Sequence, residues 1–102
     1  LVPCARLAER IAALPGRRLI FTNANADYAQ RVLAARGLDG LFEDICDIRA
    51  TGYIPKPQPP AYQHLLAAHG VNPASSLFVE DMARNLTPAK ALGMTTLWLD
   101  NG

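Results

Sequence analysis

The chain has 102 residues, so it forms one domain or part of one. Half of its residues are hydrophobic and 19% are charged, a composition that excludes an intrinsically disordered chain. The net charge of +1 comes without a basic run, so neither nucleic acid nor a membrane surface is expected as a partner. Its apolar stretches are also far shorter than the ~20 residues that cross a bilayer.

The first half of the chain predicts two helices and two strands. In order, these are a helix after Pro3 that ends at Pro15-Gly16, a strand at 18–22, a helix capped by Asn23 or Asn25 and ended by Gly37, and a strand at 45–48. Tyr28, on the second helix, is expected to pack against its neighbours rather than to contact substrate.

The second half predicts two more helices and two more strands. They follow a Pro-rich loop at 52–60. The first helix takes Pro59 and Pro60 in its first turn and ends at Gly70, and a strand follows at 76–79. The second helix lies between 82 and 92, with Thr87-Pro88 as a possible cap and first position and Gly93 as its end, and a strand follows at 94–99. Trp98 is expected in the core or in an interface.

Alternating strands and helices predict an α/β fold with a Rossmann-like parallel sheet and helices on both faces. We expect residues 1–102 to form a single partial domain. In open parallel sheets, ligands bind beyond the carboxyl ends of the strands. Thr22-Asn23 and Glu80-Asp81 both fall at such ends, so the sequence predicts that they share one site.

Two of the polar segments are suited to phosphate. The hydroxyl of Thr22 and the N–H groups of the turn after it can bind a phosphate oxygen, although the segment can also be a simple capping turn. Lys56 stands between Pro55 and Pro57, which stiffen the loop around it. A lysine held in this way can neutralise the charge of a phosphoryl group, whereas the alternative is a solvated loop lysine.

The third polar segment is suited to a divalent cation. Glu80 and Asp81 directly follow three apolar residues, and two acids at a strand end are costly unless they are solvated or bind a cation. Their hard oxygen atoms suit Mg²⁺. The alternative is a polar strand end that caps the next helix. Asn85 can orient the two acids or a water molecule bound to the metal.

Taken in order, these segments resemble the later motifs of the haloacid dehalogenase-like superfamily of phosphohydrolases. The strand ending in Thr22 resembles the motif that binds phosphate, Lys56 the lysine motif, and residues 79–85 the magnesium-binding motif. In finer detail the chain is similar to pyrimidine 5′-nucleotidases. That similarity lies in Phe21-Thr22-Asn23-Ala24, Gly52-Tyr53-Ile54-Pro55-Lys56-Pro57 and Glu80-Asp81-Met82-Ala83-Arg84-Asn85-Leu86.

The chain departs from the family at its first motif. No Asp-x-Asp follows an apolar strand, so the residues that the family uses as nucleophile and as general acid/base have no counterpart, and the helical cap that follows them is missing. Asn85 also stands where many relatives have a second acid. The expectation is therefore that this chain is the carboxyl-terminal portion of a hydrolase and begins inside a longer protein.

The resemblance implies a Mg²⁺-dependent hydrolase of small phosphate monoesters, with nucleoside 5′-monophosphates as the expected substrates and an aspartyl-phosphate as intermediate. It implies phosphate binding by Thr22, Asn23 and Lys56, and metal binding by Asp81, Glu80 and Asn85. The isolated chain is expected to be inactive. The alternatives are a noncatalytic module that binds phosphate or protein, or an inert fragment.

The resemblance also implies that the sheet lacks its central first strand, which in the family lies between the strand ending in Thr22 and the strand ending in Glu80. Removal of a central strand would leave sheet edges that recruit another strand. We therefore expect that a missing amino-terminal segment supplies the strand, that the two flanking strands close on each other, or that chains pair through their exposed edges. Cys4 and Cys46 form neither a close pair nor a zinc pattern, so two free thiols and a cytoplasmic location are expected. The first residues also lack the pattern of a signal peptide.

Overall fold

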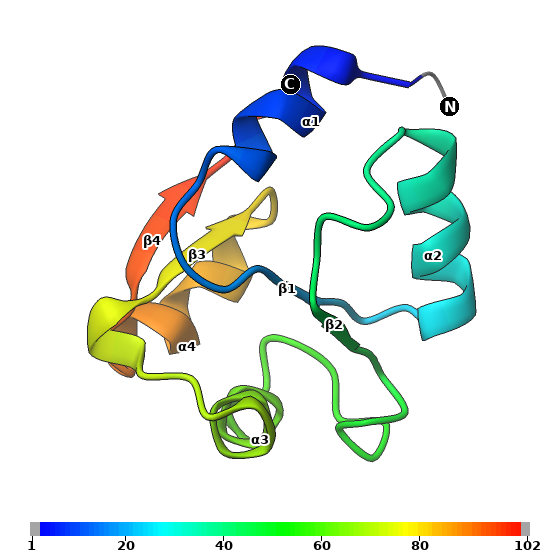
Figure 1. Ribbon diagram of the computed structural model, residues 1–102. Coiled ribbons are helices and arrows are strands. Elements are labelled where there is room, and N and C mark those ends of the chain that lie inside the picture. Colours follow the sequence, from blue (N-terminus) through cyan, green and yellow to red (C-terminus); the bar gives the residue numbers. More distant parts are fainter. Residues whose placement is uncertain (1–2, 101–102) are drawn as a thin grey trace. The chain divides into compact units, whose positions relative to one another are not determined.

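The structure, a computed structural model, describes residues 3–100. It divides into two compact units: Leu1–Ala50, here the N-terminal unit, and Thr51–Gly102, here the C-terminal unit. Each unit contains a pair of parallel strands accompanied by helices (Figure 1). The predicted α/β class with parallel strands is confirmed.

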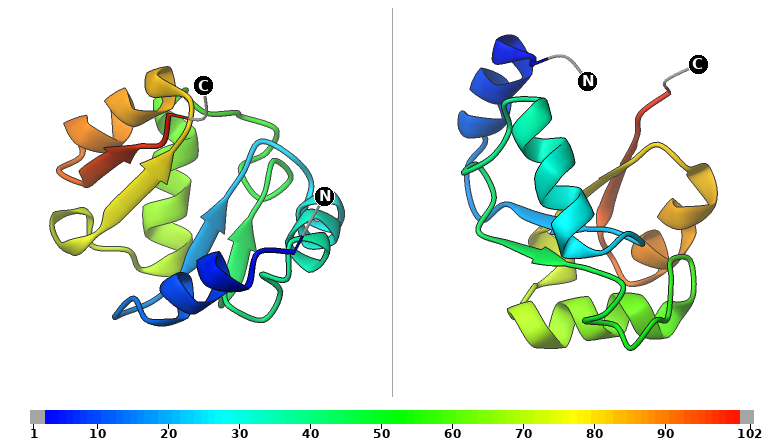
Figure 2. Two further views of the ribbon diagram at one scale, coloured as in Figure 1. Left: turned by 90° about the horizontal axis from the view of Figure 1, so that it is seen from above. Right: turned by 90° about the vertical axis from the view of Figure 1, so that its right-hand side faces the viewer.

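The N-terminal unit consists of two helices and two strands. They are α1 (Ala5–Ala12), β1 (Leu19–Phe21), α2 (Ala26–Ala35) and β2 (Asp44–Cys46). β1 and β2 lie side by side in parallel, with Leu19 opposite Asp44 and Phe21 opposite Cys46 (Figure 2). The Thr22 N–H donates to the Cys46 carbonyl over 3.0 Å, so the pairing extends one residue beyond β1.

The ends of α2 follow from local chemistry. The side chain of Asn25 accepts a hydrogen bond of 2.9 Å from the Tyr28 N–H, which satisfies one of the N–H groups that a helix start leaves without a partner. At the other end, Gly37 adopts a φ of 71°, and the Leu38 N–H donates to the Leu33 carbonyl. This is a Schellman ending, which favours glycine because the left-handed conformation strains other residues.

The C-terminal unit places its two strands over a small core. It comprises α3 (Pro59–His69), η1 (Pro73–Ser75), β3 (Leu77–Glu80), η2 (Ala83–Asn85), α4 (Leu86–Ala91) and β4 (Thr95–Trp98). β3 and β4 are parallel, with Glu80 opposite Trp98. The buried apolar residues of this unit are Ala61, Tyr62, Leu65, Ala89 and Met94. Because Glu80 ends β3, its side chain is carried at the carboxyl end of the strand.

The predicted helices and strands are present, but several of their ends differ from the prediction. The first helix ends at Ala12, before Pro15-Gly16, and three strands differ by one residue at their ends. Two further differences have a local cause. The second strand ends at Cys46 rather than at residue 48, because the chain leaves the strand at Asp47, whose carboxylate accepts backbone hydrogen bonds. The last helix begins at Leu86, directly after η2, and not at Thr87-Pro88. Pro88 is tolerated inside its first turn because N–H groups there have no intrahelical acceptor.

Tyr28 and Trp98 are each 53% exposed. Trp98 is therefore not a core residue, while its place in an interface and the packing role of Tyr28 stay predictions. Cys4 and Cys46 are free thiols, as predicted. Within residues 3–100, none of the helices is both long enough and apolar enough to cross a membrane.

Candidate functional site

A buried ion pair stands at the carboxyl end of β3. The Lys56 Nζ donates to the Glu80 Oε1 over 2.8 Å, and each side chain is only 9% exposed. Lys56 comes from the loop that precedes α3. Its ammonium also lies 5.7 Å from the centre of the Phe78 ring, close enough for a favourable cation–π contact. The structure therefore holds the lysine charge on one side by a carboxylate and on another by an aromatic ring.

Both carboxylate oxygens of Glu80 accept hydrogen bonds. Oε1 accepts from Lys56 and, over 3.0 Å, from the Nδ2 of Asn85. Oε2 accepts from the backbone N–H groups of Asp81 and Met82, over 2.9 and 3.2 Å. Burial acts to raise the pKa of Glu80, but these hydrogen bonds, that from Lys56 foremost, outweigh it and lower the pKa to about 2. Glu80 is thus an anion at neutral pH, with four donors already in place.

Asn85 links this ion pair to the core of the C-terminal unit. The residue is 3% exposed, and while its Nδ2 donates to Glu80, its Oδ1 is buried without a hydrogen-bond partner in the described part of the chain. Its backbone carbonyl accepts a hydrogen bond of 2.6 Å from the hydroxyl of Tyr62. Burial and the nearby charge of Glu80 raise the pKa of Tyr62 to about 12, so this hydroxyl stays a donor.

Asp81 differs from Glu80 in being exposed. Its backbone carbonyl accepts a hydrogen bond of 2.8 Å from the indole Nε1 of Trp98, which fixes the first residue after β3. Two adjacent acids therefore have different surroundings, since one is buried against a lysine and the other is presented to solvent.

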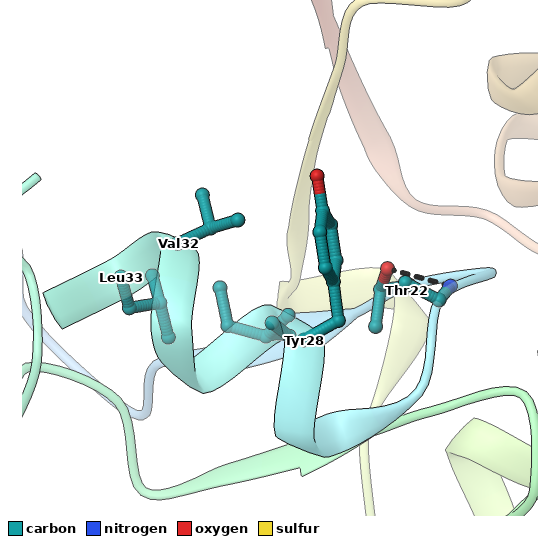
Figure 3. A pocket seen from close by; sticks show the side chains of 7 residues that line it. Thr22, Tyr28, Val32 and Leu33 are labelled. Atoms are coloured by element: carbon teal, nitrogen blue, oxygen red, sulfur yellow. Dashed lines mark hydrogen bonds between the residues drawn. The ribbon is translucent and has the colours of Figure 1, made fainter. Parts of the chain in front are cut away.

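In the N-terminal unit, the hydroxyl of Thr22 is oriented by the turn that follows it. Its Oγ1 accepts a hydrogen bond of 3.0 Å from the Ala24 N–H, which leaves its own O–H as a donor (Figure 3). Two N–H groups at the start of α2 already have acceptors, because Ala26 donates to Asp47 and Tyr28 to Asn25. A phosphate at this point could therefore accept a hydrogen bond from the Thr22 hydroxyl more readily than from the N–H groups at the start of α2.

Asp47 is a residue of this unit that the sequence analysis missed. It is 7% exposed; its Oδ2 accepts from the Ala26 N–H over 2.8 Å and its Oδ1 from the Ala50 N–H over 2.9 Å. The pKa of Asp47 is lowered, with the hydrogen bond from Ala50 as the leading cause. The predicted strand at 45–48 included Asp47, whereas the strand ends at Cys46, so Asp47 could be recognised as an acid directly after a strand only once that end was known. The carboxylate ties the end of β2 to the start of α2.

A shallow hollow of about 200 Å³ lies beside Thr22 (Figure 3). It is lined by Ile20, Thr22, Ala24, Tyr28, Ala29, Val32 and Leu33. Because ligand pockets usually measure roughly 300–1,000 Å³, we assign no ligand to it.

The predicted site residues fall into two groups. Lys56, Glu80 and Asn85 are in direct contact within the C-terminal unit, with Asp81 next to Glu80. Thr22 and Asn23 belong to the N-terminal unit.

Whether Mg²⁺ fits here depends on which side-chain oxygen atoms are still available as ligands. Residues 3–100 contain no cluster of three or more His, Cys, Asp or Glu side chains that could hold a metal ion. Glu80 is occupied by four donors, and the Oδ1 of Asn85 is buried. Asp81 is then the residue that suits Mg²⁺, which often takes one or two carboxylates and keeps several waters.

Comparison with known proteins identifies the family. The sequence profile described as haloacid dehalogenase-like hydrolase matches residues 2–93. The chain belongs to this family. The haloacid dehalogenase-like assignment made from the sequence motifs is thus confirmed, whereas the comparisons do not reach its pyrimidine 5′-nucleotidase subtype.

Individual members of the haloacid dehalogenase-like family are similar to this chain over most of its length. A phosphoglycolate phosphatase from Haemophilus influenzae is 32% identical over 83 residues, which are 81% of this chain and 37% of that protein. The L-2-haloacid dehalogenase from Xanthobacter autotrophicus, solved with chloropropionic acid covalently bound, is 30% identical with a TM-score of 0.83. That match covers 97% of this chain and 40% of the dehalogenase.

A third haloacid dehalogenase-like structure shares the fold at lower identity. This enzyme from Bacteroides thetaiotaomicron, solved as a mutant in complex with magnesium and inorganic phosphate, is 17% identical with a TM-score of 0.83. The match covers all of this chain and 56% of that one. The chain therefore spans about two fifths to somewhat over half of the relatives' lengths.

Proposed function

We propose that this chain supplies the lysine, the metal-binding acid and the phosphate-binding hydroxyl of a hydrolase that acts on small phosphate monoesters. The observation that carries the proposal is the buried pair of Lys56 and Glu80 at the carboxyl end of β3. An ammonium that is already held in place stabilises the charge on a transferring phosphoryl group without reorganising first. The similarity to a phosphoglycolate phosphatase supports the same chemistry.

The contacts suggest a distinct role for each acid. Glu80 acts as the counterion that positions Lys56, since its oxygens already accept four hydrogen bonds. Asp81, which is exposed, would hold Mg²⁺, and Asn85 orients Glu80 by donating a hydrogen bond to its Oε1. When bound, Mg²⁺ would polarise a phosphoryl oxygen and neutralise its charge. The Thr22 hydroxyl would donate to a phosphate oxygen, with Asn23 beside it.

The nucleophile of the proposed reaction lies outside these residues. A carboxylate would attack phosphorus and form an acyl phosphate as the alcohol of the ester leaves, and water would then release inorganic phosphate. The 102 residues contain no Asp-x-Asp to supply that carboxylate. We accordingly propose that a further segment provides it and pairs with this chain. A cytoplasmic location is proposed with it.

Two phosphate esters are candidate substrates of the proposed hydrolase. Three segments around Thr22, Lys56 and Glu80 resemble pyrimidine 5′-nucleotidases, which favours nucleoside 5′-monophosphates. The phosphoglycolate phosphatase relative favours 2-phosphoglycolate. Dehalogenation of 2-haloacids is the alternative reaction, suggested by the 30% identity to the L-2-haloacid dehalogenase.

The test measures product release by the protein translated from the whole reading frame. We expect phosphate release from one of the two phosphate esters in the presence of Mg²⁺, and no chloride release from L-2-chloropropionate. Asp81→Asn and Lys56→Met should each lower kcat/KM by about 100-fold or more, the usual cost of removing one electrostatic contact at the reacting group. Lys90→Met, at an exposed lysine, should leave it unchanged. Full activity of Asp81→Asn would refute the assignment.

The 102-residue chain by itself provides the second arm. It should bind Mg²⁺ weakly through Asp81, with chemical-shift changes around Asp81 that Asp81→Asn abolishes, and it should release no phosphate. Turnover by this chain alone would show that the nucleophile lies within it.

A further inference from the structure

Tyr62 contacts Phe78, which lies against Lys56, and Asn85, which donates to the carboxylate that holds Lys56. Its hydroxyl donates to the Asn85 carbonyl over 2.6 Å, and the Nδ2 of Asn85 donates to the same oxygen of Glu80 that accepts from Lys56. Its ring packs edge-to-face on Phe78, with centroids 6.0 Å apart and an interplanar angle of 84°. Phe78 in turn lies beneath the Lys56 ammonium. The polar and the aromatic supports of the lysine thus meet at one side chain.

The surroundings of Tyr62 make it a rigid anchor. The side chain is fully buried on α3, between the buried Ala61 and, one turn on, Leu65. Lys56 lies only three residues before the start of α3, so one helix fixes both the loop that carries the lysine and the tyrosine. A short hydrogen bond between buried groups costs more to lose than an exposed one, because water cannot readily replace the missing donor.

We propose that Tyr62 is a positioning residue of the active site, which sets the place of the Lys56 ammonium through Asn85 and Glu80 on one side and through Phe78 on the other. The proposal deepens the proposed function in that it takes Lys56 as the charge-offsetting group. It adds a residue that touches neither phosphate nor metal.

The chain offers a direct measurement, because Lys56 and Lys90 are its two lysines. Lys90 is exposed and serves as an internal reference, whereas the side chain of Lys56 is 9% exposed. The 102-residue chain is treated with a small acylating reagent at fixed pH, and the ratio of the two acylation rates is read by peptide mass spectrometry. Tyr62→Phe removes the hydroxyl and keeps the ring on Phe78.

We expect Tyr62→Phe to raise the Lys56-to-Lys90 rate ratio by about tenfold, the change in local opening that corresponds to loss of one buried hydrogen bond. The increase should be independent of low urea concentrations, as for a local opening, and should not follow the global unfolding curve. In Tyr62→Phe/Asn85→Ala the ratio should match that of Asn85→Ala alone, because both changes break the same chain of contacts.

Two control variants separate positioning from stability. Tyr53→Phe removes the hydroxyl of a 69% exposed tyrosine in the same loop as Lys56. Ala61→Gly lowers the stability of α3 next to Tyr62 and leaves the Asn85 contact in place. Both should keep the ratio within twofold of wild type. If Tyr62→Phe raises the ratio no more than Ala61→Gly does, Tyr62 is structural only and the proposal is wrong.

If Tyr62→Phe fails to fold, Asn85→Ala provides the test, since it removes the hydrogen bond from Asn85 Nδ2 to Glu80 and keeps Tyr62. An unchanged ratio there would overturn the proposal. Because no substrate is present, these outcomes are independent of phosphate release: absence of hydrolysis would refute the proposed function without affecting the position of Lys56.

Discussion

Asp47 and Glu80 are two buried carboxylates at the ends of parallel strands, one in each unit, and their partners differ. Asp47 accepts from two backbone N–H groups and closes a loop. Glu80 also accepts from two backbone N–H groups, but it adds a lysine and an asparagine side chain. The pKa of each is lowered. A lowered pKa at a strand end therefore does not mark a reaction site by itself; the presence of a fixed cation distinguishes the two.

The largest effect on stability is expected when Glu80 loses its negative charge, because Glu80 is the carboxylate of the two that faces a lysine. Glu80→Gln leaves the Lys56 ammonium buried without a counter-charge, so it should lower the free energy of unfolding by about 3 kcal/mol. Chemical denaturation measures this value. The double variant Lys56→Met/Glu80→Leu should lose much less, because no uncompensated charge stays behind. A loss in Glu80→Gln no larger than in the double variant would contradict the assigned ion pair.

Acid should weaken the same pair by a somewhat smaller amount, because Glu80 is only partly protonated at pH 2.5, the lowest pH of the test. The folded-state pKa of Glu80, about 2, lies below its ordinary value of 4.5. The stability it contributes is therefore fully present above about pH 4.5 and is lost as the pH falls towards 2. Urea midpoints between pH 7 and 2.5 measure the decline, which should be flatter in Glu80→Gln. A wild-type profile as flat as that of the variant would argue against the low pKa.

Removal of the other carboxylate should have a moderate and local effect. Asp47→Ala leaves the Ala26 and Ala50 N–H groups without their acceptor, at a cost of about 2 kcal/mol. Asp47→Asn retains one side-chain oxygen and should cost less. Amide hydrogen exchange should accelerate at Ala26 and Ala50 and stay unchanged at Asp81 and Met82. Faster exchange at all four amides would mean that the two carboxylates do not act locally.

The smallest effect is expected at an exposed ion pair of the N-terminal unit. Arg17 and Glu43 form two hydrogen bonds of 2.9 Å, but their side chains are 49% and 44% exposed. Exposed pairs contribute little to stability, so Glu43→Gln should leave the urea midpoint unchanged within error. A shift of the urea midpoint comparable to that of Asp47→Ala would show that exposure does not explain why the two acids contribute differently to stability.

The sequence predicted the parts of the fold that depend on local signals. Asn25, Gly37 and Gly70 mark helix ends because capping and the left-handed conformation involve only neighbouring residues. The start of the last helix was missed because η2 precedes it, and a short 3₁₀ turn has no strong sequence signal.

The candidate site was predicted in its residues and less well in its contacts. Lys56, Glu80 and Asn85 were singled out as residue types suited to phosphate and metal, and the structure brings them together. That Glu80 faces the lysine rather than solvent could not be predicted, since it depends on contacts between residues 24 positions apart. The same holds for Tyr62 and Asp47, whose roles come from backbone groups 23 and 21 positions away.

The hydrogen bond from the Trp98 indole to the Asp81 carbonyl has a practical consequence. Trp98 is the only tryptophan of the chain, and it is 53% exposed, so its fluorescence reports on water and hydrogen bonding at one point. That point is the backbone of the acid proposed to hold Mg²⁺. The protein thus contains its own optical probe of this strand end, and emission spectra could follow changes around Asp81 without an added label.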